Sequence, residues 1–151
     1  MESDTAAPRG CTNLKLRQAS RLVTRHYESF FASSGLKITQ YSLLSHVVKL
    51  GPLRAGELAA AMQLDASTLT RNLQPLLQQG LVQMHTGDDA RSRVIEATAA
   101  GRALRSAAQK AWKQAQTALN QRLGIERVAA LHALIDECLP LLEQHEGADH
   151  D

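Results

Sequence analysis

The chain has 151 residues, of which 44% are hydrophobic and 21% charged, which suits a single globular domain with a sizeable core. Aromatic residues make up only 3%, so we expect a core of Leu, Ala and Val, a composition that favours helix. No apolar run reaches the roughly 20 residues of a membrane span, and the polar, acidic start differs from a signal peptide. We therefore expect a cytoplasmic protein.

The charge is distributed unevenly along the chain. Residues 1–53 carry seven Lys or Arg against three Asp or Glu, residues 54–93 carry four of each, and residues 94–151 carry six against eight. The net charge of +2 is weak support for a nucleic-acid partner. Any basic surface on the neutral middle segment must come from the placement of its charges.

Three helices are predicted before residue 65. Apolar residues recur three or four apart over residues 12–32, and a second helix, capped by Thr39, is expected to continue to Leu50. Gly51-Pro52 ends it, and an Ala-rich helix follows over residues 54–62. Its short connection to the next helix has helix-turn-helix spacing.

The segment 65–82 reads DASTLTRNLQPLLQQGLV and is the most informative stretch of the chain. Asp65 is a suitable N-cap, and Gly80 stands where a left-handed residue ends a helix. Leu69, Leu73, Leu76 and Leu77 form an apolar stripe at helical spacing. The small and hydrogen-bonding residues outside the stripe suit a helix that reads the major groove, although an ordinary amphipathic surface helix has the same periodicity.

Two short strands and two long helices are predicted after Gly80. Residues 81–85 and 93–97 alternate weakly around a Gly-containing charged loop and predict a hairpin, the wing. Thr98 is expected to cap a helix over 99–123, and a last helix over 126–145 carries an inward apolar stripe. That stripe comprises Val128, Leu131, Leu134, Ile135, Cys138, Leu141 and Leu142.

The predicted fold class is mainly α, a winged helix-turn-helix with long N- and C-terminal dimerisation helices. We expect residues 39–98 to form the winged helix, residues 12–38 and 99–145 a helical dimerisation layer, and residues 1–11 and 146–151 flexible tails. The apolar faces of the terminal helices flank the winged helix and need a partner. A symmetric homodimer with exchanged helices would supply one.

With these elements in this order, the chain resembles the MarR family of bacterial transcription regulators over roughly residues 12–143. The most specific match is LDASTLTRNLQPLLQQGLV, which is similar to the recognition helix of the family. GELAAAMQLD is similar to the preceding helix and GLKITQYSLL to the entry into the second helix. In the wing, Asp89-Ala90-Arg91 and Arg93 match part of the family signature, which ATAAGR follows.

The resemblance implies a homodimeric repressor that binds a pseudo-palindromic operator in double-stranded DNA and is released by a small ligand or by cysteine oxidation. It implies that the wing enters the minor groove. The simpler alternative is that Arg91 and Arg93 are solvated charges of the loop. Arg71 either contacts a guanine or pairs with Asp89 as a wing brace. The candidate DNA-binding residues are Ala66, Ser67, Thr68, Thr70, Arg71, Asn72, Arg91 and Arg93.

Two departures from the family pattern stand out. The fuller family wing has an earlier Asp and Arg where this chain has Thr86-Gly87-Asp88, so one brace and one positive contact are missing. Pro75 lies inside the recognition helix and removes the hydrogen bond to the Arg71 carbonyl, so a kink is expected there. The kink follows the DNA-reading half of the helix.

The cysteines are candidate redox sensors. Lys15 and Arg17 lie near Cys11, and such cations favour the reactive thiolate. The resemblance to hydroperoxide sensors of the family places Cys11 about two residues too early, although Tyr27 and Tyr41 fall at similar places. Cys138 is a candidate resolving partner across the dimer, and the simpler alternatives are a core Cys138 and a loose N-terminal Cys11 thiol.

A ligand cleft is predicted where the second helix faces the dimerisation layer. Arg17, Arg21, Tyr41 and His46 are its candidate residues, and they suit an anionic aromatic ligand; a purely structural role for His46 is the alternative. The six histidines show no tight metal spacing, so neither a metal nor a cofactor is predicted.

The sequence carries no enzyme motif, because it has no Gly-rich phosphate loop, nucleophile elbow or plausible pair of carboxylates. The main alternative to a DNA-binding regulator is a dimeric winged helix that binds protein without reading DNA sequence. The neutral charge of residues 54–93 leaves that alternative open.

Overall fold

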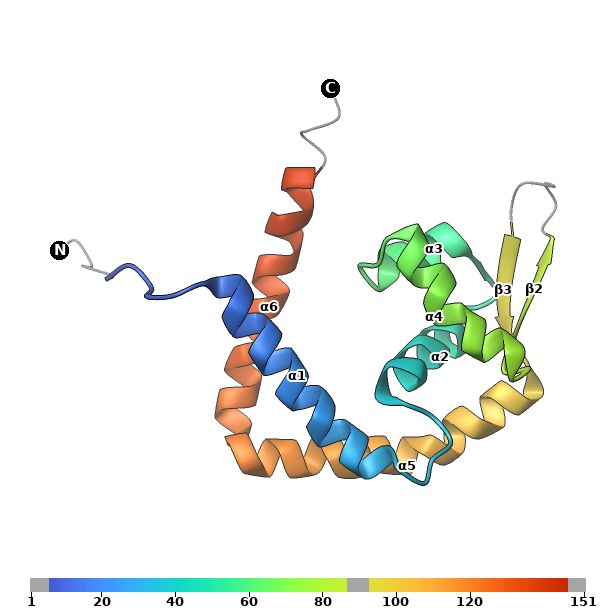
Figure 1. The fold of residues 1–151 in the computed structure, drawn as a ribbon, viewed down its shortest axis with the longest axis horizontal. Coiled ribbons are helices and arrows are strands. Elements are labelled where there is room, and N and C mark those ends of the chain that lie inside the picture. The colour runs from blue at the N-terminus through green and yellow to red at the C-terminus, as the bar shows by residue number, and fades with distance from the viewer. Residues whose placement is uncertain (1–5, 87–92, 147–151) are drawn as a thin grey trace. The chain divides into compact units, whose positions relative to one another are not determined.

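The computed structural model of the chain describes residues 6–86 and 93–146 (Figure 1). It confirms the predicted fold class, a mainly helical winged helix with a small antiparallel sheet. The elements in chain order are α1 (Thr12–Phe31), α2 (Ile38–Leu50), β1 (Leu53–Arg54), α3 (Ala55–Ala61), α4 (Ala66–Gln78), β2 (Val82–Thr86), β3 (Arg93–Ala97), α5 (Ala99–Leu123) and α6 (Ile125–Glu146).

The chain divides into two compact units, and the division falls inside α5. The first unit extends to Trp112 and the second begins at Lys113. The first therefore contains α1 to α4, the sheet and the first half of α5, and the second contains the rest of α5 together with α6. The predicted grouping of residues 12–38 with 99–145 in one dimerisation layer stays a prediction.

The helix-turn-helix of α3 and α4 is built as the sequence predicts, whereas α2, which precedes it, begins earlier than predicted. Thr39 was expected to cap this helix, but Lys37 occupies the N-cap and Thr39 lies within the first turn. The Lys37 backbone N–H donates to Oε1 of Gln40 at 3.0 Å, and the Ile38 N–H donates to Oε1 of Glu28 at 2.9 Å. Because these side chains satisfy the first amides, the helix begins before Thr39.

The sheet has one strand more than the predicted hairpin. Its order is β1-β3-β2, and both pairings are antiparallel. Leu53 in β1 pairs with Ile95 in β3 and is itself buried. A strand of two residues is too short to show an alternating pattern, so β1 was not predicted.

A core of mostly aliphatic side chains joins α2, α3, α4 and the sheet, which lie together in Figure 1. Its largest fully buried members are Leu43, Leu44, Val47, Leu58, Leu76 and Ile95. Leu69 and Leu73 are buried as well, while Leu77 is only half-buried. This burial fixes which side of α4 faces inward, so it also decides which side chains α4 presents to solvent.

The terminal helices leave large apolar side chains uncovered in this single chain. In α6 only Val128 of the predicted stripe is buried, whereas Leu134 is 59% and Ile135 39% exposed. The inward direction predicted for the rest of the stripe is therefore not realised within one chain. No described helix, over residues 6–86 and 93–146, is both long and apolar enough to cross a membrane.

Candidate nucleic-acid interface and ligand pocket

The start of α4 is fixed by its predicted cap. Oδ1 of Asp65 accepts from the Thr68 backbone N–H at 2.7 Å and from the Ser67 hydroxyl at 2.8 Å. The Thr68 amide, and then the Ser67 hydroxyl, hold the pKa of the Asp65 carboxyl below its usual range. The carboxylate therefore remains ionised at neutral pH and anchors the first turn.

The side chains predicted to read DNA lie on the outward side of α4. Ala66, Ser67, Thr70, Arg71 and Asn72 are exposed. Two of the hydrogen-bonding groups already have partners within the helix: the Thr70 hydroxyl donates to the Ala66 carbonyl at 2.9 Å, and Nη2 of Arg71 donates to Oγ1 of Thr68 at 3.3 Å. This last bond holds the Arg71 guanidinium beside Thr68, which is half-buried.

The end of α4 turns through Gly80, as predicted. Gly80 has φ +69°, a conformation that glycine adopts without strain, and the Leu81 N–H donates to the Leu76 carbonyl at 2.9 Å. The Thr98 hydroxyl donates to the Gly80 carbonyl at 2.6 Å and accepts from the Gly101 N–H at 3.0 Å. The exit of α4 is thereby joined to the first turn of α5.

Only the base of the wing lies within the described residues. The predicted brace Asp89 and the predicted minor-groove residue Arg91 fall outside them. Arg93 begins β3 with an exposed side chain, and its Nη1 donates to Sδ of Met84 at 4.0 Å. On the same hairpin, Nε2 of His85 lies 3.2 Å from Oε2 of Glu96.

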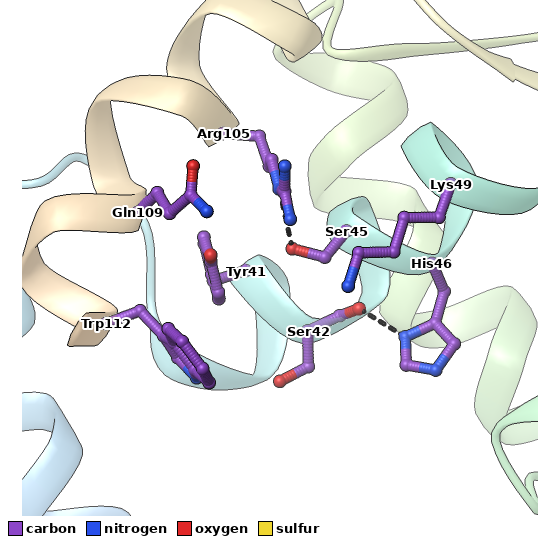
Figure 2. A pocket seen from close by; sticks show the side chains of 8 residues that line it. All are labelled: Tyr41, Ser42, Ser45, His46, Lys49, Arg105, Gln109 and Trp112. Atoms are coloured by element: carbon purple, nitrogen blue, oxygen red, sulfur yellow. Dashed lines mark hydrogen bonds between the residues drawn. The ribbon is translucent and has the colours of Figure 1, made fainter. Parts of the chain in front are cut away.

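A pocket of about 250 Å³ lies between α2 and the first half of α5 (Figure 2). Nε of Arg105 donates to the buried Ser45 hydroxyl at 3.2 Å, and its guanidinium carbon lies 6.0 Å from the centre of the Tyr41 ring. Nδ1 of His46 is 2.7 Å from the Ser42 carbonyl oxygen. The full lining is Tyr41, Ser42, Ser45, His46, Lys49, Arg105, Gln109 and Trp112.

The pocket includes half of the predicted cleft residues. Tyr41 and His46 line it, whereas Arg17 and Arg21 are exposed on α1 and do not. Its cations are instead Lys49 and Arg105, which sequence reasoning missed. Residues 105, 109 and 112 share one side of a helix, and so do residues 41, 45 and 49. That spacing shows in the sequence, but only the packing of α5 on α2 brings the two sides together.

Both cysteines are exposed free thiols. Cys11 is the N-cap residue of α1, and its carbonyl accepts from the Lys15 N–H at 3.1 Å. Cys138 is exposed in the single chain, where the stripe that carries it is uncovered, so its core position in a dimer stays a prediction. The two thiols belong to different compact units of the chain.

Comparison with known proteins agrees with this architecture. The MarR family model matches residues 34–92, which include α2, α3 and α4. The crystal structure of the Mycobacterium tuberculosis transcriptional regulator MosR in complex with DNA is 33% identical, with a TM-score of 0.71, and the match covers 86% of this chain and 99% of that one. The chain belongs to the MarR family. The match to MosR decides this through its identity and coverage, because the family model alone matches less than half of the chain.

Two more distant relatives of this MarR-family chain show how far the similarity extends. Apo MarR from Escherichia coli is 20% identical with a TM-score of 0.67, over 88% of this chain and 100% of that one, which shows the shared fold. An uncharacterized HTH-type transcriptional regulator of Bacillus subtilis, YwoH, is 27% identical over 84 residues, or 56% of this chain. The matched region spans 61% of the length of that curated relative.

Proposed function

We propose that the protein is a transcription regulator that binds double-stranded DNA as a homodimer through α4. The observation that carries this proposal is the division of α4: Leu69, Leu73 and Leu76 are buried, while small and hydrogen-bonding side chains on its first two turns are exposed. A helix with this division can enter the major groove without disturbing the core. The DNA complex of the 33% identical M. tuberculosis relative supports the same partner.

In this proposal Ser67, Thr68 and Thr70 contact phosphates and base edges, and Arg71 stands at the end of the reading half. The two α4 helices of a dimer enter successive major grooves of a pseudo-palindromic site, about 34–36 Å apart. The wing, with Arg91 and Arg93, follows into the minor groove, where the phosphate potential attracts cations.

We further propose that the protein is a repressor released from DNA by an anionic aromatic ligand, which binds in the pocket between α2 and the first half of α5. Lys49 and Arg105 supply positive charge there, while Tyr41 and Trp112 supply aromatic surface. A carboxylate that takes the Arg105 guanidinium replaces the neutral Ser45 hydroxyl with a charged partner, and such a hydrogen bond is stronger. Because Arg105 is on α5 and Ser45 on α2, this exchange changes the contact between those helices.

Oxidation is the second proposed route to release, since Cys11 is an exposed thiol and Cys138 lies on the α6 stripe that is proposed to meet the partner subunit. A peroxide would oxidise one thiolate to a sulfenic acid, which condenses with the second thiol and loses water. Mild hydroperoxide treatment followed by a non-reducing gel should give a band at dimer mass. The band should disappear in both Cys11→Ser and Cys138→Ser, and its persistence in either variant would exclude this pairing.

A salt titration tests the DNA-binding proposal most directly. Binding of the wild-type protein to a random duplex should weaken steeply with salt, because each neutralised phosphate releases counterions. Selection from a random pool, with and without oxidant, should then yield a two-fold symmetric site. A flat salt response would contradict DNA binding and favour the protein-interaction alternative.

Fluorescence tests the ligand proposal, because Trp112 is the single tryptophan of the chain and lines the pocket. Benzoate should change its emission saturably and release the selected duplex, whereas the neutral benzyl alcohol should do neither. Arg105→Gln should raise the benzoate concentration that half-saturates the change in Trp112 emission, because it removes the positive partner of the carboxylate. Equal responses to benzoate and benzyl alcohol would show that the pocket does not recognise the charge.

A further inference from the structure

A second hollow, of about 180 Å³, lies on another part of the first compact unit. It is lined by Lys37, Thr39 and Gln40 at the start of α2 and by Arg71, Asn72 and Pro75 of α4. Two of these residues, Arg71 and Asn72, belong to the predicted reading half of α4. The three residues from α2 belong to neither the interface nor the pocket described above.

The lining of the hollow is rich in cationic groups and hydrogen-bond donors. Lys37 carries three N–H donors and Arg71 five, and the Thr39 hydroxyl and the Asn72 amide can donate too. Oε1 of Gln40 already accepts from the Lys37 backbone N–H, which leaves its amino group as the free end. None of the six lining residues carries a carboxylate.

Glu28 and Asp65 accept hydrogen bonds at the starts of α2 and α4, and the Asp65 carboxylate also attracts the Arg71 guanidinium. Oε1 of Glu28 accepts from the Ile38 N–H at 2.9 Å, and Oδ1 of Asp65 accepts from Thr68 and Ser67 at the cap of α4. Neither residue lines the hollow. The charge that the hollow presents is therefore positive, and the group that complements it is an anion with several acceptor oxygens.

We propose that this hollow holds a phosphate of the DNA backbone, with Lys37 and Arg71 as its two cations and the Thr39 hydroxyl and Asn72 amide as further donors. The inference rests on the proposed DNA binding and adds Lys37, Thr39 and Gln40 to the interface. A phosphate there lies beside the side chains that read bases, so it fixes the position of α4 along the groove. It also gives Arg71 a phosphate partner in place of a guanine or Asp89.

The exposure of the lining favours DNA over a free anion. Lys37, Thr39, Arg71 and Asn72 are all exposed, so water and salt screen their attraction for a single small ion. A DNA duplex brings many phosphates at once and releases its condensed counterions, which makes the same exposed cations effective. The source of the phosphate is therefore the backbone of the duplex.

Salt dependence of DNA binding tests the proposal with a matched pair of variants. Lys37→Gln removes one charge from the hollow, and Lys110→Gln removes one from an exposed position of α5. With the selected duplex and a random one, Lys37→Gln should reduce the slope of log K against log salt by about 1.8, because each subunit of the homodimer loses one phosphate contact; this is about sixtyfold in affinity per decade of salt. An unchanged slope in Lys37→Gln, or an equal reduction in Lys110→Gln, would overturn the proposal.

Single methylphosphonate linkages, which remove the charge of one phosphate, locate the contact. A scan across the selected site should reveal a linkage in each half-site that weakens wild-type binding but causes no further loss in Lys37→Gln. If the affinity losses caused by Lys37→Gln and by the linkage multiply at every position, the two act independently and the assignment is contradicted. Inorganic phosphate that displaces DNA more strongly than chloride of equal ionic strength would also overturn it in favour of a free-anion site.

These outcomes separate the two proposals. If the wild-type protein shows no steep salt dependence, DNA binding itself is wrong, whatever the variants do. If the wild-type response is steep and only the Lys37 prediction fails, the regulator binds DNA without using this hollow. Thermal unfolding followed by circular dichroism checks that both variants are folded.

Discussion

The hydroxyl of Thr98 bonds to the carbonyl oxygen of Gly80 at 2.6 Å, which joins the exit of α4 to the start of α5. The same hydroxyl accepts from the Gly101 N–H, so one side chain also caps α5. The Thr98 backbone N–H adds a bond to the Leu81 carbonyl at 3.0 Å. A helix proposed to read DNA is thus held at its far end by the helix that lines the ligand pocket.

Replacement of Thr98 measures this connection. Thr98→Val keeps the shape of the side chain but removes both hydroxyl bonds, so it should lower the free energy of unfolding by about 1–2 kcal/mol. Thr98→Ser retains the hydroxyl and should remain close to wild type. Urea unfolding followed by circular dichroism compares the three proteins, and equal stability of the Val and Ser variants would show that the hydroxyl contributes nothing.

Replacement of a helical glycine by alanine usually stabilises a protein, but at Gly101 it should destabilise it. A Cβ at this position would overlap the backbone carbonyl oxygen of Leu81, so Gly101→Ala should destabilise the protein by about 1–3 kcal/mol. At Gly56 in α3 an added Cβ meets nothing within 4 Å, so Gly56→Ala should stabilise by about 0.5–1 kcal/mol. Melting temperatures that move in the same direction for both variants would contradict this assignment.

Asp65 gives a dependence on pH with a defined sign. Its pKa is lowered in the folded chain, so its contribution to stability is complete above the unfolded pKa of about 3.9 and is lost as pH falls through the folded value. Asp65→Asn keeps a capping oxygen without the charge, whereas Asp65→Ala loses both. At pH 7 the Ala variant should unfold at the lowest temperature. The difference in unfolding temperature between the wild type and Asp65→Asn should shrink below pH 4. A difference that stays constant with pH would exclude a stabilising role for the ionised cap.

The uncovered stripe of α6 tests the proposed homodimer. Leu134→Ala with Ile135→Ala removes apolar surface that is exposed in the single chain. The molar mass from light scattering should therefore fall below that of a dimer, and the protein should lose stability. The neighbouring pair Asp136→Ala and Glu137→Ala, which lies off the stripe, should remain dimeric. A well-folded monomer in the Leu134 and Ile135 variant would contradict the exchanged-helix arrangement, in which the dimer supplies the missing core.

Local chemistry made most of the elements predictable. Asp65 and Thr98 bind the amides of the turns that they precede, and Gly80 adopts its left-handed conformation, because each effect depends on residues a few positions away. The cap of α2 was misplaced since Thr39 and Lys37 are equally near the helix start. Only the reach of the Gln40 and Glu28 side chains decided between them.

The sequence by itself determined the winged-helix order and the exposed side of α4, because periodicity and caps depend on neighbouring residues. Tertiary packing alone decided which distant side chains meet. It brought Arg105 to Ser45 across 60 positions of sequence and left Arg17 and Arg21 outside the pocket. It also placed Lys37 beside Arg71 on one hollow. Such meetings depend on how helices pack against each other, and helical spacing shows which residues share a side without showing what that side faces.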